Sequence, residues 1–484
     1  MALSGALSNA LSGLTANSRA AALIASNISN ATTEGYGQRS LVLGARGGSG
    51  GVQVIGVSRN VDQAVLADRR LSDSHTGYAN DMQAFSSRVE KLLGASGEPG
   101  SLTTHFAAFE NALLTAASDP SSMQRLQQVA FKAQDFTDKL NVVSDHIQAE
   151  RGSADRSIAS QVETVNTALG RIRQLNEAIK DSSVRDGDPS SLMDERQKVI
   201  DSISGIVPVR TISREFGEVA VHTASGVPLL DSMINSEPAV IGFTAANAVT
   251  ADLTMIGGDL SGLTINGRPI NSSNEGPLGG GTLGAQLQVR DVAAVDMQAV
   301  LDGLARDFLE RFAAGGPDST VGAGDPGLFT DAGSAFATTD EVGLAGRISL
   351  NSLVDPSGTG AWRIRDGLGA ASQGAVGDAT LMQGYTDALE SLVPPSSANL
   401  GTSATSFSEH VSDFVSAVAA ARVRADGEQS FSSAQNTALK ELELSKGVDT
   451  DAELQTLLRI EQQYAANARV MSAVDELMQT LMNI

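Results

Sequence analysis

The two ends of this chain carry matching apolar patterns, which constrain its fold more than any other feature. Near the C-terminus, an apolar seam advances by alternating steps of three and four residues. Its members are Leu457, Ile460, Tyr464, Asn467, Met471, Val474, Met478 and Leu481. Such steps are the heptad signature of a coiled-coil helix, here with one polar member. Because no glycine or proline follows Gly447, a helix of roughly 30 residues, about 50 Å long, can form there.

A second seam of the same kind begins the chain. It consists of Leu3, Leu7, Ala10, Leu14, Asn17, Ala21, Ile24 and Ile28. Each seam contains one asparagine, and a buried asparagine in a coiled-coil seam costs stability but fixes register and partner number. We therefore predict that the two ends pair as helices of one coiled coil. The alternative is two amphipathic helices that pack separately on a globular core.

The composition excludes several classes of function. A length of 484 residues allows two to four domains. The absence of cysteine excludes disulfides, zinc–thiolate sites and thiol catalysis. A formal net charge of −22 disfavours nucleic acid and anionic membranes as partners, because both attract basic surfaces. No apolar run is long enough to cross a bilayer, and the N-terminus lacks the pattern of a cleaved secretory signal, so any export is expected to use another route.

The chain between the ends is expected to form a helical bundle with a β insertion, and the fold class is mainly α. Expected helices cover residues 62–93, 102–117, 121–182, 190–207, 281–316 and 406–445. For the helix 121–182, Asp119 is the expected cap and Pro120 the expected first-turn proline. Residues 208–280 are Gly-rich and β-branched, with strands expected at 219–221, 240–243 and 263–265 and a hairpin turn at Asn266-Gly267. In the Gly/Asp-rich segment 317–376, strands are expected at 347–350 and 361–365.

These elements predict four discontinuous units. They are a coiled-coil core of residues 1–36 and 447–484, a helical bundle of 37–207, 281–316 and 377–446, an inserted β domain of 208–280, and a β-containing segment of 317–376. Because the β domain lies between bundle elements, we expect it to be removable without loss of the bundle.

No catalytic, cofactor or metal site is expected. The histidines lie far apart and show no paired ligand spacing; they are His75, His105, His146, His222 and His410. The Gly-rich segment 276–286 lacks the spacing and lysine of a phosphate-binding loop, so a linker is expected. Three aspartates, Asp318, Asp325 and Asp331, flank Gly-rich turns, but their spacing is not that of a calcium-binding EF-hand and favours a solvated loop.

The paired carboxylates of Asp194 and Glu195, followed by Arg196, could suggest acid–base chemistry. Adjacent residues on one helical turn point to different sides, however, so surface ion pairs are expected instead. We expect no enzyme activity.

Residues 12–36 resemble the N-terminal signature of the axial proteins of the bacterial flagellum, the rod, hook and hook-associated proteins. The matching positions are Ser12, Gly13, Leu14, Asn27, Ile28, Asn30, Gly35 and Tyr36. The sequence departs from the signature conservatively at Ser26, Ser29 and Glu34. Residues 447–484 resemble the matching C-terminal signature. Residues 190–207 and 281–316 resemble the hook-associated protein 1 family rather than the hook protein.

The resemblance implies a structural component at the junction of hook and filament that filament assembly requires. It implies self-association into a ring or helical layer through both terminal seams, contact with the hook protein and a second hook-associated protein, and a cytoplasmic export chaperone at the C-terminal helix. It also implies export in the unfolded state, without a cleaved signal, to the extracellular flagellum. The alternatives are a hook or distal-rod protein, or a secreted coiled-coil adhesin.

Overall fold

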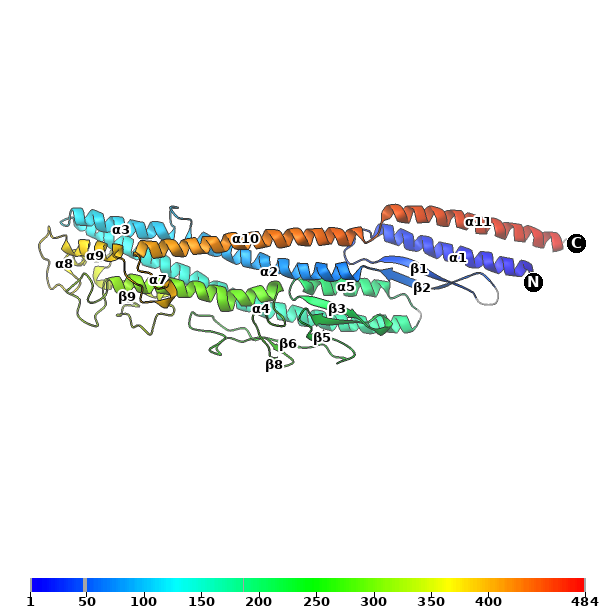
Figure 1. The fold of residues 1–484 in the computed structure, drawn as a ribbon, viewed down its shortest axis with the longest axis horizontal. Coiled ribbons are helices and arrows are strands. Elements are labelled where there is room, and N and C mark those ends of the chain that lie inside the picture. Colours follow the sequence, from blue (N-terminus) through cyan, green and yellow to red (C-terminus); the bar gives the residue numbers. More distant parts are fainter. Residues whose placement is uncertain (1, 47–49, 186, 483–484) are drawn as a thin grey trace.

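The computed structural model describes residues 2–46, 50–185 and 187–482, and shows an elongated molecule with both chain ends at one tip (Figure 1). Long helices run along the molecule, so the mainly α fold class is confirmed. The helices are α1 (Ala2–Ser29), α2 (Gln63–Leu93), α3 (Leu102–Ser118), α4 (Met123–Val184), α5 (Ser190–Ser204), α6 (Gly281–Gln288), α7 (Ala294–Arg311), α8 (Arg363–Asp366), α9 (Thr380–Glu390), α10 (Phe407–Ser445) and α11 (Thr450–Met482).

Within the described residues, the strands form four small antiparallel sheets. They are the ribbon β1 (Gln38–Ala45) and β2 (Val52–Asn60), the sheet β3 (Val209–Ser213), β4 (Val219–Thr223) and β5 (Pro228–Leu230), the sheet β6 (Ile241–Gly242), β7 (Thr264–Ile265) and β8 (Arg268–Pro269), and the pair β9 (Phe329–Asp331) and β10 (Ile348–Leu350). The expected hairpin turn at Asn266-Gly267 joins β7 to β8, and both residues have the positive φ that this turn requires.

Helix α4 confirms the long helix expected at residues 121–182, but its expected start is wrong. The N-cap position is Ser122, and Met123 is the first helical residue. Asp119 instead forms a local turn, in which its carbonyl accepts from the Ser122 amide and its carboxylate accepts from the Ser121 hydroxyl. The aspartate therefore stabilises the α3–α4 turn. Aspartate side chains often bond to nearby backbone or side-chain groups in this way instead of capping a helix.

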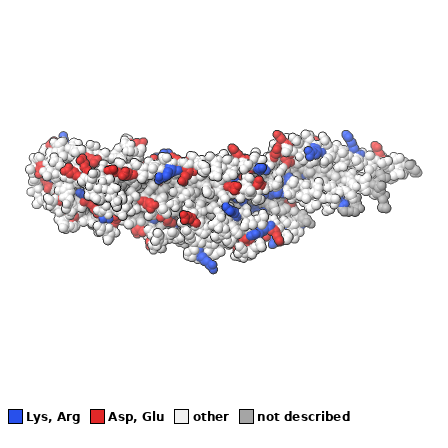
Figure 2. All heavy atoms as spheres, in the orientation of Figure 1, with Lys and Arg blue, Asp and Glu red and all other residues white. Residues whose placement is uncertain are grey.

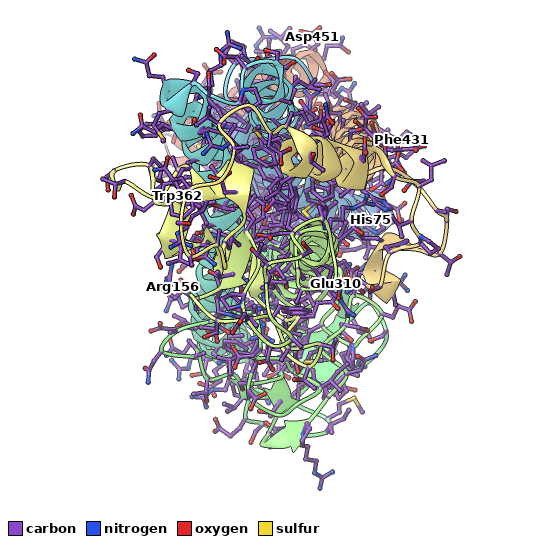
Figure 3. All side chains as sticks on the ribbon, turned by 90° about the vertical axis from the view of Figure 1, so that its left-hand side faces the viewer. His75, Arg156, Glu310, Trp362, Phe431 and Asp451 are labelled. Atoms are coloured by element: carbon purple, nitrogen blue, oxygen red, sulfur yellow. The ribbon has the colours of Figure 1, made fainter. Side chains whose placement is uncertain are left out.

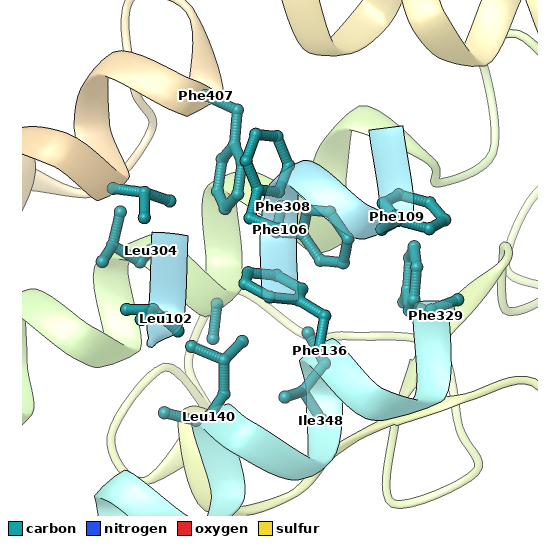
Figure 4. Packing of buried hydrophobic residues seen from close by; sticks show 14 of the residues in the cluster. Leu102, Phe106, Phe109, Phe136, Leu140, Leu304, Phe308, Phe329, Ile348 and Phe407 are labelled. Carbon is teal, nitrogen blue, oxygen red and sulfur yellow. The ribbon is translucent and has the colours of Figure 1, made fainter. Parts of the chain in front are cut away.

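The larger apolar core lies at the end of the molecule away from the termini. Helices α2, α3, α4, α7, α9 and α10 contribute to it, together with the segment around β9 and β10. At its centre, Phe106 and Phe109 of α3 meet rings from α4, α7, β9 and α10 in tilted and edge-to-face contacts, the favoured aromatic geometries (Figure 4). Helix α10 is capped at its start, because the Ser406 hydroxyl accepts from the Glu409 amide.

The smaller core is shared between the bundle and the β region, which argues against simple removal of residues 208–280. Val162, Val165 and Leu169 of α4 pack in the same cluster as Val221 and other side chains of the β region. Deleting the region would expose this apolar surface to water.

Two buried arginines also fasten the β region to the bundle. Arg151 of α4 donates to the carbonyl oxygens of Thr250 and Leu253, at 2.8 and 2.7 Å. Arg290 pairs with Asp155 at 2.7 Å and donates to the carbonyl of Ser261. Deletion of residues 208–280 would leave buried guanidinium groups without these acceptors, at a substantial cost.

Three local expectations were wrong or incomplete. The strand expected at 361–365 is wrong, because residues 361–362 form a turn that leads into α8, and Ala361 and Ile364 are both buried at the three-residue spacing of a helical turn. The expected helix 281–316 divides at a π-helical turn, Val289–Ala293, and ends at Arg311. Strand β1 was not expected at all, and it pairs with β2.

Candidate assembly interface

Helices α1 and α11 pack side by side and antiparallel at the tip of the molecule, as the two seams predicted (Figure 1). The Asn27 side chain bonds to Glu453, while Gly13 lies against the Asn467 side chain. These two contacts define one continuous register. The pairing of the chain ends is therefore a structural fact, and the role of the seam residues in assembly stays a prediction.

The pair leaves much of both seams uncovered. Three members are buried: Ala10, Ile24 and Val474. The half-buried members are Leu7, Leu14, Asn17, Ala21, Ile28, Leu457, Ile460, Asn467 and Met471, whereas Tyr464, Met478 and Leu481 are exposed. Leu3 lies in α1, but its side chain is outside the described residues. Two helices alone cannot enclose a seam of this length, so apolar surface remains available.

The two seam asparagines do not face each other. A Cβ atom placed on Gly13 would lie 2.6 Å from Nδ2 of Asn467, so the amide occupies the space that this glycine leaves. Asn17 lies one helical turn further along α1, and its buried Nδ2 has no hydrogen-bond partner. The antiparallel register thus aligns Asn467 with a glycine, and a reciprocal asparagine pair is excluded.

Asn27 joins four chain segments at the base of the helix pair. Its Nδ2 donates to the Arg39 carbonyl and to Oε1 of Glu453, both at 2.9 Å. Its Oδ1 accepts from the Tyr36 hydroxyl and from the Arg39 amide, at 2.9 and 3.0 Å. Glu453 is buried and also accepts from Gln38 at 2.8 Å. Asn27 and Tyr36, matched to the flagellar signature from sequence, therefore fix the start of α11 against α1 and the ribbon.

Asp194 of α5 holds the ribbon to the bundle. Its Oδ2 accepts from Nη2 of Arg39 at 2.6 Å, and its Oδ1 accepts from Nε of Arg59 at 2.7 Å. Oδ1 also accepts from the amide of Gly37 at 3.1 Å. The expected surface ion pair is therefore wrong for Asp194, which is buried. The expectation holds for Glu195, which pairs with Arg171 where both side chains are about half exposed.

The polar face of α5 continues beyond Asp194 and connects three parts of the fold. Gln197 accepts from Arg59, and Asp201 accepts from Arg69 and Arg70 of α2 at 2.8 and 2.7 Å. Arg196 points to the β region, where it donates to the Gly217 carbonyl. Burial and the neighbouring positive charges lower the pKa of Arg196 to about 10.

The remaining signature residues stabilise the local backbone. The Ser12 hydroxyl accepts from the amide of Val52 at 3.2 Å and so attaches the ribbon to α1. The Asn30 side chain donates to the carbonyl of Ser26 at the end of α1. Gly35 has φ of +74°, a conformation that disfavours other residues.

We name the polar joint formed by Asn27, Tyr36, Gln38, Arg39, Arg59, Asp194 and Glu453 the collar. Within the described residues, neither apolar core includes a side chain from α1, the ribbon or α11. The collar thus joins the terminal helix pair to the bundle through hydrogen bonds and ion pairs, without a shared apolar core.

Comparison with known proteins gives two family matches that follow this architecture. Residues 86–316 match the model described as the flagellar hook-associated protein FlgK helical domain, which includes α3 to α7 and the β region. Residues 444–484, which include α11, match the C-terminal model of the flagellar basal body rod FlgEFG proteins. Over these two ranges the chain is similar to flagellar hook-associated protein 1 and to the basal body rod proteins.

Similar curated proteins include hook-associated protein 1 of Escherichia coli K12, 23% identical over 64% of this chain and 56% of that protein. The Bacillus subtilis 168 protein is 22% identical over 99% of this chain and 97% of its own length. The chain thus spans about half the length of the enterobacterial relatives and nearly all of the Bacillus one. A solved flagellar hook junction protein FlgK from Burkholderia pseudomallei aligns with a TM-score of 0.42 and 18% identity over 56% of this chain and 46% of that chain.

Two further candidate sites from the sequence can be placed in the structure. Asp318 is buried, where it accepts from the amides of Thr320 and Leu368, so the expectation of a solvated loop is wrong for it. Across residues 2–46, 50–185 and 187–482, no group of three or more potential ligands is placed to hold a metal ion.

His75 lines a shallow surface hollow of about 300 Å³ beside the exposed Phe431, on one side of the molecule (Figure 3). No helix in the described ranges is long and apolar enough to span a membrane.

Proposed function

We propose that this chain is a structural subunit of the bacterial flagellum that forms the junction between hook and filament. The observation that carries the proposal is the incomplete burial of the terminal helix pair. Helix α1 contains a single charged residue, Arg19, in 28 residues. Tyr464, Met478 and Leu481 of α11 remain exposed. A continuous apolar surface that stays exposed at one tip of a molecule typically marks a contact with other subunits.

Further support comes from the distribution of charge. On the face shown in Figure 2, charged side chains are sparser over the terminal pair than over the bundle. Self-association into a ring or helical layer would bury this sparsely charged surface, and contacts that do not close within one plane generate a tube. In such a tube the terminal pair would form the inner wall and the bundle the outer wall.

The proposal includes specific partners. The subunit would contact the hook protein on one side and a second hook-associated protein on the other, outside the cell, after export in the unfolded state. Before export, the exposed end of α11, with Leu477, Met478, Leu481 and Met482, would bind a cytoplasmic chaperone, since flexible methionines adapt to different partners. Recovery of the chaperone by the full chain but not by a chain ending at Gly447 would support this part.

A hook or distal-rod protein is the second candidate from the same assembly, and the C-terminal match at residues 444–484 favours it. The match over residues 86–316, a much longer range, favours the junction protein. A secreted coiled-coil adhesin has no comparable support.

Complementation tests the proposal directly. In a flagellated strain that lacks its hook-associated protein 1, the wild-type chain should restore filaments on hooks visible by electron microscopy. Ala22→Glu, on the exposed side of α1, should abolish filaments because it places charge in the proposed subunit contact. Ala438→Glu, at another exposed alanine, in α10, is the matched control and should restore them. Bare hooks with the wild-type chain, or filaments with Ala22→Glu, would refute the proposal.

A further inference from the structure

Two exposed faces lie on opposite sides of α1. The first, the ribbon face, consists of Val42, Arg46 and Ile55, and its two apolar side chains are 39% and 67% exposed. The register shifts here because Ile55 is an extra residue of β2, left without a partner between the pairs Val42–Gly56 and Leu43–Val54. Ile55 lies across Gly44, so the glycine provides the space that lets this side chain cover the ribbon.

The second face, the acidic face of α11, points away from α1. It consists of Asp451, Leu454, Leu458, Glu461 and Ala465, all exposed and spaced by alternating steps of three and four. That spacing places the five side chains in one stripe of the helix. Leu454 and Leu458 are 48% and 59% exposed, so the stripe has an apolar centre between two acids.

Both faces lie at the same height along α1. The ribbon is attached to α1 at Ser12 by the Val52 amide and at Asn27 by the Arg39 backbone. Helix α11 passes the same stretch, from Asn467 against Gly13 to Glu453 against Asn27. In Figure 1 the ribbon and α11 flank α1 from opposite sides. A second copy displaced sideways would therefore bring its ribbon face against the acidic face of the first.

The charges of the two sides are opposite, although the whole chain is strongly acidic. Residues 1–60 contain four arginines, Arg19, Arg39, Arg46 and Arg59, and one acid, Glu34. Residues 449–484 contain six acids and two arginines. Among the described residues, Arg46 has no ion-pair partner, and neither do Asp451 and Glu461. Like faces would repel each other, whereas unlike faces attract and can exclude water from the leucines between them.

We propose that the ribbon face of one copy of this chain packs on the acidic face of α11 of the next copy. The contact is head-to-tail, because each copy uses one face to bind a neighbour on one side and the other face to bind a neighbour on the other side. Repetition of such a contact builds a ring or a helix rather than a closed dimer. This inference rests on the proposed self-association and names the surfaces that carry it.

Engineered cysteines test the contact, because the chain has no cysteine of its own. The full chain with Ile55→Cys and Leu458→Cys, treated with a bis-maleimide cross-linker, should give a ladder of multimers on a denaturing gel. Each single variant alone should stay monomeric, and a mixture of the two singles should give only dimers containing one of each. The matched control carries Ile55→Cys and Val423→Cys, the latter at a 63% exposed site on α10 outside the acidic face, and should give no ladder.

Several outcomes would overturn the inference. These are the absence of a ladder from the double variant, equal ladders from the control pair, or dimers from either single variant at the yield of the mixture. A charge test gives a second measurement: Arg46→Glu or Glu461→Arg alone should reduce the cross-linking yield at least tenfold, and both together should restore it. Restored filaments without a ladder would leave the proposed function in place and refute this contact. A ladder without restored filaments would support this contact and refute the proposed function.

Discussion

Replacing Asp194 by alanine is the sharpest test of the collar. The carboxylate accepts from two arginines and one backbone amide, and its side chain is 11% exposed, while those of Arg39 and Arg59 are 16% and 10% exposed. Removing one partner of a buried ion pair costs about 3–5 kcal/mol, because the remaining charge is left without compensation. Since water can still reach both arginines, we expect the lower end of that range, about 3 kcal/mol.

The assay should report on the collar itself, because a chain with several structural units need not unfold in one step. Hydrogen exchange at the Gly37 amide does so, since this amide donates directly to Asp194. Asp194→Ala should accelerate its exchange by roughly two orders of magnitude, which corresponds to about 3 kcal/mol.

Glu195→Ala is the matched control for this experiment. It removes the neighbouring carboxylate, whose partner Arg171 is exposed, and a surface pair contributes at most about 1 kcal/mol. Equal exchange rates of the Gly37 amide in the two variants would refute the assignment of Asp194 as the attachment point of the ribbon.

Three further results are expected. Gly13→Ala should weaken the α1–α11 pair by about 1–3 kcal/mol, because the added methyl group clashes with Asn467 and this outweighs the gain in helix propensity. The double variant Gly13→Ala with Asn467→Ala should recover the lost stability. Thermal unfolding followed by helix content would measure both variants. Burial raises the pKa of Asp302 to about 6, so its ionisation lowers the free energy of unfolding by up to about 3 kcal/mol as the pH rises from about 4 to 6. Denaturant titrations at several pH values should show this decrease in the wild-type chain and its loss in Asp302→Asn. Deletion of 208–280 should lower the denaturant midpoint of the bundle, and an unchanged midpoint would contradict the shared core.

The heptad steps at the two ends were enough to predict the pairing of α1 with α11, because an apolar stripe must find an apolar partner. They were not enough to give the register. That depends on which side chain fits over Gly13 and on the bond from Asn27 to Glu453, 426 residues apart in the chain. Such contacts leave no mark in local periodicity.

The role of Asp194 was also missed, although a signal was present. Asp194, Gln197 and Asp201 recur at three- and four-residue steps on a face that also carries the buried Ile200. Polar residues that keep helical phase with buried ones indicate a face that bonds to other elements. Their arginine partners lie more than 130 positions earlier, in the ribbon and α2, so the sequence could not identify them.

Helix α4 has a mechanical consequence for the molecule. Its 62 residues span about 93 Å at 1.5 Å per residue, and its side chains enter both apolar cores. Bending the bundle would require close-packed side chains in both cores to slide past one another, so the bundle is stiff against bending. The collar has no close-packed apolar core, so it resists bending less than the bundle does. When a force bends the subunit, we therefore expect the terminal helix pair to rotate at the collar while the bundle keeps its shape.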